Sequence, residues 1–173
     1  SEQLMDAFKG YDVTVLSGHT HVQCNSQPRE NIREYNIASI GGAWWLWDCK
    51  YSKDGTPLGY QVFQHKGKLA RNYYKALGQR NDYQTRIFSP GTIAVYPDDI
   101  ILKIWNWDKR WSITASQCIG NSIKSEPVEI EQISMADPDY SSYLQKEYIF
   151  NKNKAGKGSQ PINNVYFFFR AKV

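Results

Sequence analysis

The feature that most constrains this chain is an apolar run that ends in a glycine and two alternate histidines. Val13-Thr14-Val15-Leu16-Ser17 has the composition of a buried strand, and Gly18-His19-Thr20-His21 follows it directly. Neutral imidazole is the commonest metal ligand in proteins. If the strand continues through the motif, its side-chain period of two places His19 and His21 on one face, as a common metal site requires. The alternative is that both histidines are polar residues of a turn.

The Gly-His-x-His motif resembles the last metal-binding motif of the calcineurin-like metallophosphoesterases. Two further segments resemble those that close the catalytic domain in one bacterial branch of this family: Ile40-Gly41-Gly42-Ala43-Trp44-Trp45 and Asp54-Gly55-Thr56-Pro57-Leu58-Gly59-Tyr60. Others resemble signatures of the extra C-terminal β-domain of that branch: Ile104-Trp105-Asn106 with Trp111, Asp137-Pro138, and Val165-Tyr166-Phe167-Phe168-Phe169-Arg170-Ala171. The chain therefore resembles the C-terminal portion of such an enzyme.

The resemblance implies a mainly β fold, in which the truncated end of an α/β sandwich is followed by an antiparallel β-sandwich domain. It also implies two divalent metal ions, which activate water for the hydrolysis of a phosphate ester. His19 would bind one ion and His21 the other, and Gly18 would let the backbone come close to the site. Histidine together with carboxylate ligands suits Mn, Fe or Zn. The same resemblance favours an exported or periplasmic enzyme.

Three motifs that this family carries before Gly-His-x-His do not occur in the sequence. They are Asp-x-His, Gly-Asp-x-x-Asp and Gly-Asn-His-Asp/Glu, and 18 residues precede His19. We therefore expect a missing N-terminal part of the catalytic domain to supply the other metal ligands. We also expect the chain alone to be catalytically inactive.

The pattern of polar and apolar residues divides the chain near residue 80. Residues 1–80 are expected to end the catalytic domain as the last turns of a helix followed by a strand meander. The expected elements are a helix end over 4–10 closed by Gly10, a strand over 12–17, a polar loop over 25–31, strands over 34–40 and 44–49, a turn at Asp54-Gly55, and a hairpin of 60–64 with 69–74.

Residues 81–173 are expected to form an all-β domain, which the polar residues 76–86 connect to the first part. Residues 100–107 and 111–115 suggest a hairpin with aromatic pairs across the strands. Further strands are expected over 128–133 and 165–169, and a loop over 151–160. Several short strands at this spacing favour a sandwich.

Tryptophans are the next candidates for the site. Trp44 and Trp45 would give the substrate pocket an aromatic wall for an apolar or sugar-like part of the ester. We favour the alternative that these residues, with Trp47, pack in the core and between the domains, because indole buries a large area. The same choice applies to Trp105, Trp107 and Trp111. The aspartates at 98, 99 and 137 are predicted to be turn or cap residues rather than catalytic carboxylates.

Composition excludes several other classes of function. The net charge is +4, from 21 basic and 17 acidic residues. Because the basic residues are scattered, we expect no nucleic-acid partner. No apolar run approaches the ~18 residues of a membrane-spanning helix. Three cysteines lack metal-type spacing and leave the redox compartment open.

A truncated sheet is expected to leave apolar side chains exposed. Val13, Val15, Leu16, Val62 and Phe63 would be under-covered where strands are missing, unless the β-domain shields them or copies of the chain self-associate.

The alternative to an enzyme is a binding module, in which an aromatic-rich β-sandwich recognises carbohydrate or protein and the histidines are incidental. We favour the enzyme.

Overall fold

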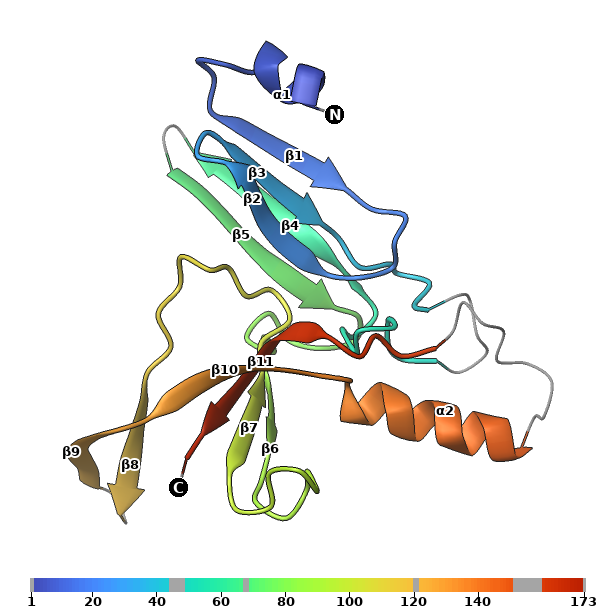
Figure 1. The fold of residues 1–173 in the computed structure, drawn as a ribbon, viewed down its shortest axis with the longest axis vertical. Helices are drawn as coiled ribbons and strands as arrows, with labels where there is room; N and C mark the ends of the chain where they lie inside the picture. The colour runs from blue at the N-terminus through green and yellow to red at the C-terminus, as the bar shows by residue number, and fades with distance from the viewer. Residues whose placement is uncertain (1, 44–48, 67–68, 120–121, 151–159, 173) are drawn as a thin grey trace.

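The computed structural model describes residues 2–43, 49–66, 69–119, 122–150 and 160–172, whose arrangement is shown in Figure 1. Strands predominate and form several small sheets, so the expectation of a mainly β chain is confirmed. Among these residues, the helices are the short α1 (Glu2–Ala7) and the longer α2 (Pro138–Phe150). No described helix is long and apolar enough to cross a membrane.

The first sheet has the order β1–β3–β2 and contains β1 (Val13–Ser17), β2 (Cys24–Arg29) and β3 (Ile32–Asn36). β1 pairs with β3 in parallel, and β2 pairs with β3 in antiparallel orientation. The expected meander is thus wrong at this point, because β1 skips its neighbour in the sequence.

The polar loop expected over residues 25–31 is also wrong, because most of it is strand β2. Its side chains alternate between exposed and half-buried, as expected for a strand at the edge of a sheet. Most of these side chains are polar, which is why the sequence suggested a loop. Pro28 lies where the pairing with β3 shifts register, between Ser26 and Arg29, so its missing N–H interrupts no regular ladder.

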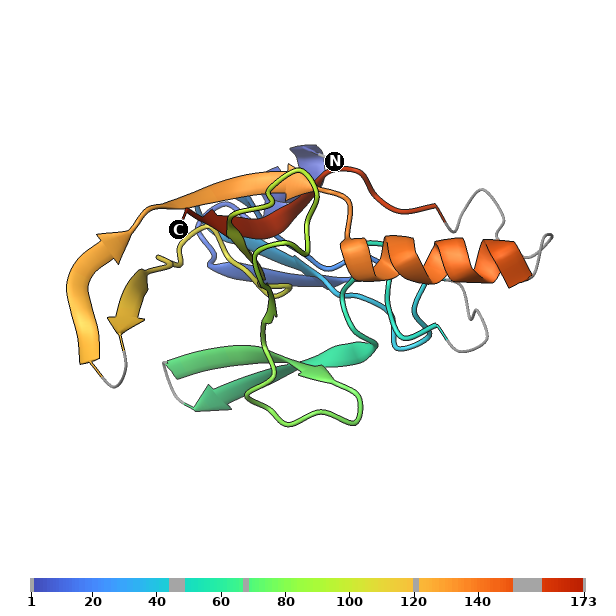
Figure 2. The same ribbon diagram turned by 90° about the horizontal axis from the view of Figure 1, so that it is seen from below.

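The next two strands form the hairpin that the sequence predicts. β4 (Gly59–Lys66) and β5 (Leu69–Ala76) pair from Gly59 with Ala76 to Lys66 with Leu69. Figure 2 shows this hairpin as a layer of its own beneath the first sheet.

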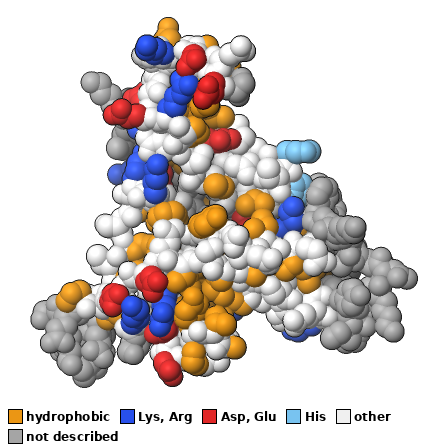
Figure 3. Space-filling model, viewed as in Figure 1, with side chains coloured by type: hydrophobic (Ala, Val, Ile, Leu, Met, Phe, Trp, Pro, Cys, Tyr) orange, Lys and Arg blue, Asp and Glu red, His pale blue; other side chains and the backbone are white. Residues whose placement is uncertain are grey.

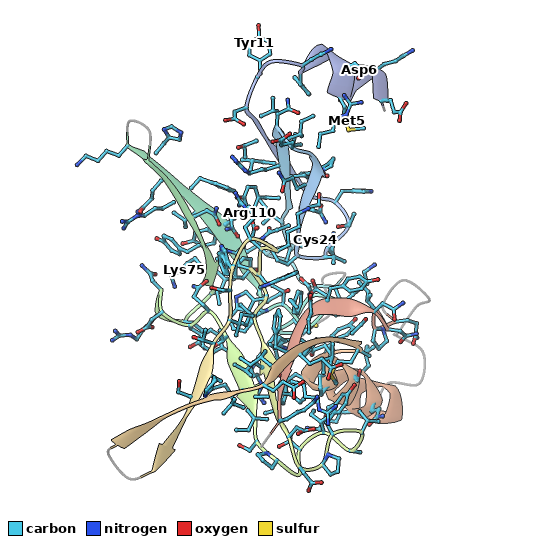
Figure 4. All side chains as sticks on the ribbon, turned by 60° about the vertical axis from the view of Figure 1, so that its left-hand side comes forward. Met5, Asp6, Tyr11, Cys24, Lys75 and Arg110 are labelled. Carbon is cyan, nitrogen blue, oxygen red and sulfur yellow. The ribbon has the colours of Figure 1, made fainter. Side chains whose placement is uncertain are left out.

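An open groove of about 1020 Å³ lies between the first sheet and the β4–β5 hairpin. Its walls include Leu16 and Phe63, which are 55% and 39% exposed, and Arg110, which is labelled in Figure 4. Val13, Val15 and Val62 are half-buried. The expectation of apolar under-coverage is thus confirmed most clearly for Leu16 and Phe63.

The C-terminal part is built on a four-stranded antiparallel sheet of order β10–β11–β7–β6. Its strands are β6 (Arg86–Phe88), β7 (Ile100–Lys103), β10 (Ile130–Met135) and β11 (Val165–Ala171). A separate hairpin consists of β8 (Ala115–Ile119) and β9 (Ser122–Val128). The stacking of these sheets as a sandwich stays a prediction.

The hairpin expected between residues 100–107 and 111–115 is wrong. β7 ends at Lys103 and pairs with β6 and β11, while β8 pairs with β9. The chain leaves β7 in a turn, with the Trp107 N–H donating to the Ile104 carbonyl at 3.0 Å. Trp105 and Trp107 thus pack inward from a turn and not across a ladder.

Helix α2 also corrects the expectation of an all-β C-terminal part. Asp137 caps it, because its Oδ1 accepts the Tyr140 N–H at 2.7 Å. Pro138 occupies the first helical position, where its missing N–H is harmless. The prediction that Asp137 is a cap residue is confirmed.

The main core draws side chains from both sides of the expected boundary at residues 80 and 81. Tyr74 and Ala76 from β5 lie in one buried cluster with Trp105 and Phe168. The extensive contact expected between the two parts is therefore present, although the expected strand over 44–49 and the Trp44–Trp47 cluster lie largely outside the described residues. The division into domains 1–80 and 81–173 stays a prediction.

Candidate functional site

The Gly-His-x-His motif lies in a loop immediately after β1, not in a continuing strand. His19 and His21 have φ angles of 74° and 57°, in the left-handed region that non-glycine residues rarely adopt. The argument that strand alternation puts both rings on one face is therefore wrong. Backbone strain of this kind is concentrated at functional sites, where the surrounding structure maintains it. Gly18 and His19 are exposed, and Figure 3 shows histidine side chains, in pale blue, at the surface of the molecule.

Strand β3 holds the middle of this loop through the side chain of Asn36. Its Nδ2 donates to Thr20 Oγ1 at 2.5 Å and to the Val22 carbonyl at 3.0 Å. Its Oδ1 accepts a hydrogen bond from Ser17 Oγ at 3.3 Å. One amide at the end of β3 therefore connects the residue before the motif with two residues inside and after it.

The ring of His21 is oriented by the backbone. Its Nδ1 lies 2.5 Å from the Gly42 carbonyl oxygen, which can only accept, so Nδ1 carries the proton. A neutral imidazole that donates from Nδ1 has its lone pair on Nε2. Metal-bound histidines use this arrangement, in which a backbone carbonyl fixes the tautomer. His21 therefore fits the role of a metal ligand.

Only glycine fits at position 42. Its φ is +63°, and an added Cβ would lie 2.7 Å from Leu58 Cδ2 and 2.9 Å from the Tyr51 carbonyl oxygen. Because the same residue supplies the acceptor for His21, this tight packing fixes where the acceptor lies.

The end of the loop is held by a buried carboxylate. Asp54 is 1% exposed, and its Oδ2 accepts the Gln23 N–H at 2.6 Å. Its Oδ1 accepts the Thr56 N–H at 2.9 Å within its own turn. Burial raises the pKa of Asp54 to about 6, and the two backbone N–H groups oppose that rise.

Behind the loop lies a cluster of side-chain amides centred on Asn106. Its Oδ1 accepts from Gln23 Nε2 at 3.4 Å, Asn25 Nδ2 at 3.2 Å and Gln61 Nε2 at 3.2 Å. Its Nδ2 donates to Asn72 Oδ1 at 3.3 Å. One residue of the C-terminal part thus binds residues of three strands and one loop of the N-terminal part.

A buried ion pair joins the turn of Asp54 to the C-terminal part. Lys103 Nζ lies 2.5 Å from Asp137 Oδ2, and the two residues are 1% and 0% exposed. The same ammonium donates to the Gly55 carbonyl at 3.0 Å. Desolvation raises the pKa of Asp137, and the charge of Lys103 opposes that rise. An added Cβ at Gly55, whose φ is +76°, would lie 1.8 Å from Asp137 Cγ.

A cavity of about 260 Å³ opens between this loop and the C-terminal sheet. Its lining includes Val22, the residue after the motif, together with Cys24, Trp105, Trp107 and Phe167. Figure 4 labels Cys24, the residue that begins β2. The walls are mainly apolar side chains.

The predicted aromatic wall of Trp44 and Trp45 lies outside the described residues. Among the other tryptophans, Trp105 is 1% exposed and packs in the core against Tyr83, with ring centroids 5.0 Å apart. Trp107 packs edge-on against Phe169 at 5.5 Å. Packing, the interpretation favoured from the sequence, is confirmed for both. Trp111 is 46% exposed.

The histidine loop was found from the sequence, but the residues that hold it were not. Asn36, Asp54 and Asn106 are polar residues without a motif of their own, and the last two were noted only within segments that resemble the family. Within the part of the chain that the structure describes, no group of three or more His, Cys, Asp or Glu side chains could hold a metal ion.

Comparison with known proteins places this geometry in context. Residues 34–173 match the family model described as the C terminal of calcineurin-like phosphoesterase. No curated protein and no solved structure matches the chain.

Proposed function

Because this chain belongs to the calcineurin-like phosphoesterases, with residues 34–173 matching their C-terminal part, we propose that it completes an enzyme that hydrolyses phosphate esters. His19 and His21 would each hold one of two divalent ions, of Mn, Fe or Zn. Two such ions, when bound, lower the pKa of a bridging water and supply hydroxide for in-line attack on phosphorus.

The observation that carries the proposal is the orientation of His21. The Gly42 carbonyl accepts a hydrogen bond from Nδ1–H, and this tautomer of a neutral imidazole carries its lone pair on Nε2, the form that binds a metal ion. The strained backbone at both histidines supports the same role, because the loop is maintained at the cost of unfavourable φ angles. Carboxylate ligands would come from the missing N-terminal part of the catalytic domain.

The apolar cavity beside Val22 supports a phosphate ester whose organic part is uncharged and apolar in part. Asp54 is the acidic residue among its lining, and it is buried. A phosphate held at the histidines could place its organic group against Trp107 and Phe167, the role that the sequence suggests for Trp44 and Trp45.

The test is alanine substitution at each histidine in the full-length enzyme. His19→Ala and His21→Ala should each lower metal affinity and reduce turnover by orders of magnitude while the melting temperature stays near that of the wild type. His65→Ala is the matched control, because His65 is exposed near the end of β4. If either variant keeps near-wild-type turnover at saturating metal, that histidine is not a ligand.

The alternative, a binding module, has one observation in its favour. A hollow of about 200 Å³ on the C-terminal part is lined by Trp107, Trp111 and Phe169, among other residues. Aromatic faces of this kind bind sugar rings or apolar side chains. Quenching or enhancement of tryptophan fluorescence by oligosaccharides, lost in Trp111→Ala, would support this function. An unchanged spectrum across a panel of oligosaccharides would count against carbohydrate binding.

A further inference from the structure

The loop that carries the histidines depends on its neighbours for its shape. Residues 18–22 lie outside any strand, and two of them have left-handed φ angles without being glycine. Such a conformation persists only where the surrounding structure over-determines it. Three residues outside the loop, Asn36, Gly42 and Asp54, meet this need with four hydrogen bonds.

Asp54 divides its two oxygens between two tasks. Oδ1 serves its own turn through the Thr56 N–H, whereas Oδ2 reaches the Gln23 N–H, two residues beyond His21. A carboxylate whose only task was to cap its turn would need the first contact alone. The second contact fixes the point at which the chain leaves the loop and enters β2.

The C-terminal part fixes the position of the turn that contains Asp54. Lys103 at the end of β7 donates to the Gly55 carbonyl, and Asp137 before α2 packs so closely that residue 55 must be glycine. On the other side, the Tyr74 hydroxyl donates to the Pro57 carbonyl at 2.7 Å. The position of Asp54 Oδ2 is thus set by strands and a helix far away in the sequence.

We propose that Asp54 and Asn36 are positioning residues for the metal ligand His21, and that the C-terminal part acts on the site by holding the turn of Asp54. This inference rests on the proposed function. It gives the C-terminal part a role at the metal site that is separate from any contact of Trp107 or Phe167 with the substrate. The mechanism is the one by which outer partners of metal ligands tune metal affinity in other proteins.

The experiment is titration of the full-length apo-enzyme with Mn²⁺ by calorimetry, together with melting temperatures and the kcat and KM for a chromogenic phosphate ester. Asp54→Asn and Asn36→Ala should each weaken Mn²⁺ binding by about 10-fold, the lower end of the effect of losing a direct partner of a ligand, because both act through other residues of the loop. Asp108→Asn is the matched control, because Asp108 pairs with Arg110 and does not contact the loop. It should bind Mn²⁺ as the wild type does.

Each outcome supports or overturns the inference. Asp54→Asn with a lowered melting temperature but unchanged Mn²⁺ affinity would restrict Asp54 to a role in its turn and overturn its role at the site. If Asp54→Asn does not fold, Asn36→Ala decides, because Asn36 is half-buried at the end of β3 and its side chain bonds to Ser17, Thr20 and Val22. His21→Ala distinguishes failure of the proposed function from failure of the positioning role. If His21→Ala binds Mn²⁺ as the wild type does, the proposed function fails. If His21→Ala loses binding while Asp54→Asn and Asn36→Ala keep it, only the positioning role fails.

Discussion

Removal of the buried Lys103 charge should destabilise the chain strongly and in a pH-dependent way. In Lys103→Met, the buried Asp137 carboxylate keeps the Tyr140 N–H but loses its counter-ion. Breaking a buried pair in this way costs about 3–5 kcal/mol. The variant can avoid an unpaired buried charge by protonating Asp137. From the ordinary pKa of 3.8, this protonation costs about 4 kcal/mol at pH 7. We therefore expect a loss of about 3–4 kcal/mol at pH 7.

The direction of the pH dependence follows from the same carboxyl group. Without Lys103, the pKa of Asp137 in the folded state rises further above its unfolded value, so the folded state keeps a proton that the unfolded chain releases. Stability is then lost as pH rises above about 4, and retained below it. At pH 5 protonation costs only about 2 kcal/mol, so the defect of Lys103→Met should be roughly half as large as at pH 7.

Urea denaturation followed by tryptophan fluorescence at pH 5 and pH 7 measures both effects. Lys103→Met/Asp137→Asn should recover most of the loss, because asparagine keeps an acceptor for the helix cap but carries no charge. Lys75→Met is the control, because Lys75 is half-buried and donates to the carbonyls of Ala76 and Gln79. A Lys103→Met loss below about 1 kcal/mol, or a double variant no more stable than the single one, would refute the reasoning.

Four further outcomes are expected. Because burial raises the pKa of Asp54 from 3.8 to about 6, wild-type stability should fall by about 3 kcal/mol as pH rises through that window, and urea titrations should find this slope flattened in Asp54→Asn. Gly55→Ala should lower the melting temperature far more than Gly78→Ala: both have left-handed φ angles, but only the first Cβ meets a neighbour, at 1.8 Å. The chain alone should show no metal-dependent hydrolysis of a chromogenic phosphate ester, and turnover abolished by His21→Ala would contradict this. Sedimentation should detect self-association that Leu16→Lys weakens, and a strict wild-type monomer would exclude pairing through the exposed apolar groove.

The sequence correctly predicted the elements that depend on patterns within a few consecutive residues. The strand expected over 60–64 and the turn at Asp54-Gly55 depend on a few consecutive residues, and both appear, although burial along β4 does not alternate. Strand β2 was missed because the side chains that alternate between exposed and half-buried positions are mostly polar, so the sequence shows no alternation of apolar and polar residues. Helix α2 was missed because Asp137-Pro138 is equally typical of a turn and of a helix start, and the packing of Tyr140 and Leu144 against Ala43 and Cys49 is not visible in the sequence.

The site divides in the same way. The histidine motif is local and was found, whereas its shape was wrong because backbone strain leaves no periodic trace in a sequence. Asp54 and Gln23 are 31 positions apart, and Asn106 and Gln23 are 83 apart. Hydrogen bonds between single polar residues at such distances have no signature in one sequence. Their geometry becomes readable only when the fold brings them together.

The amide cluster around Asn106 has a consequence for anyone who would exchange these parts between enzymes. Gln23, Asn25, Gln61 and Asn72 all direct polar groups toward a residue that lies beyond the expected boundary. A graft of residues 81–173 onto another catalytic domain would therefore separate Asn106 from its hydrogen-bond partners. Buried amides without partners would remain on both sides of the new interface, at a cost in stability. The unit that can be inherited or engineered as a whole must include both the tail and the amide-bearing strands of its host.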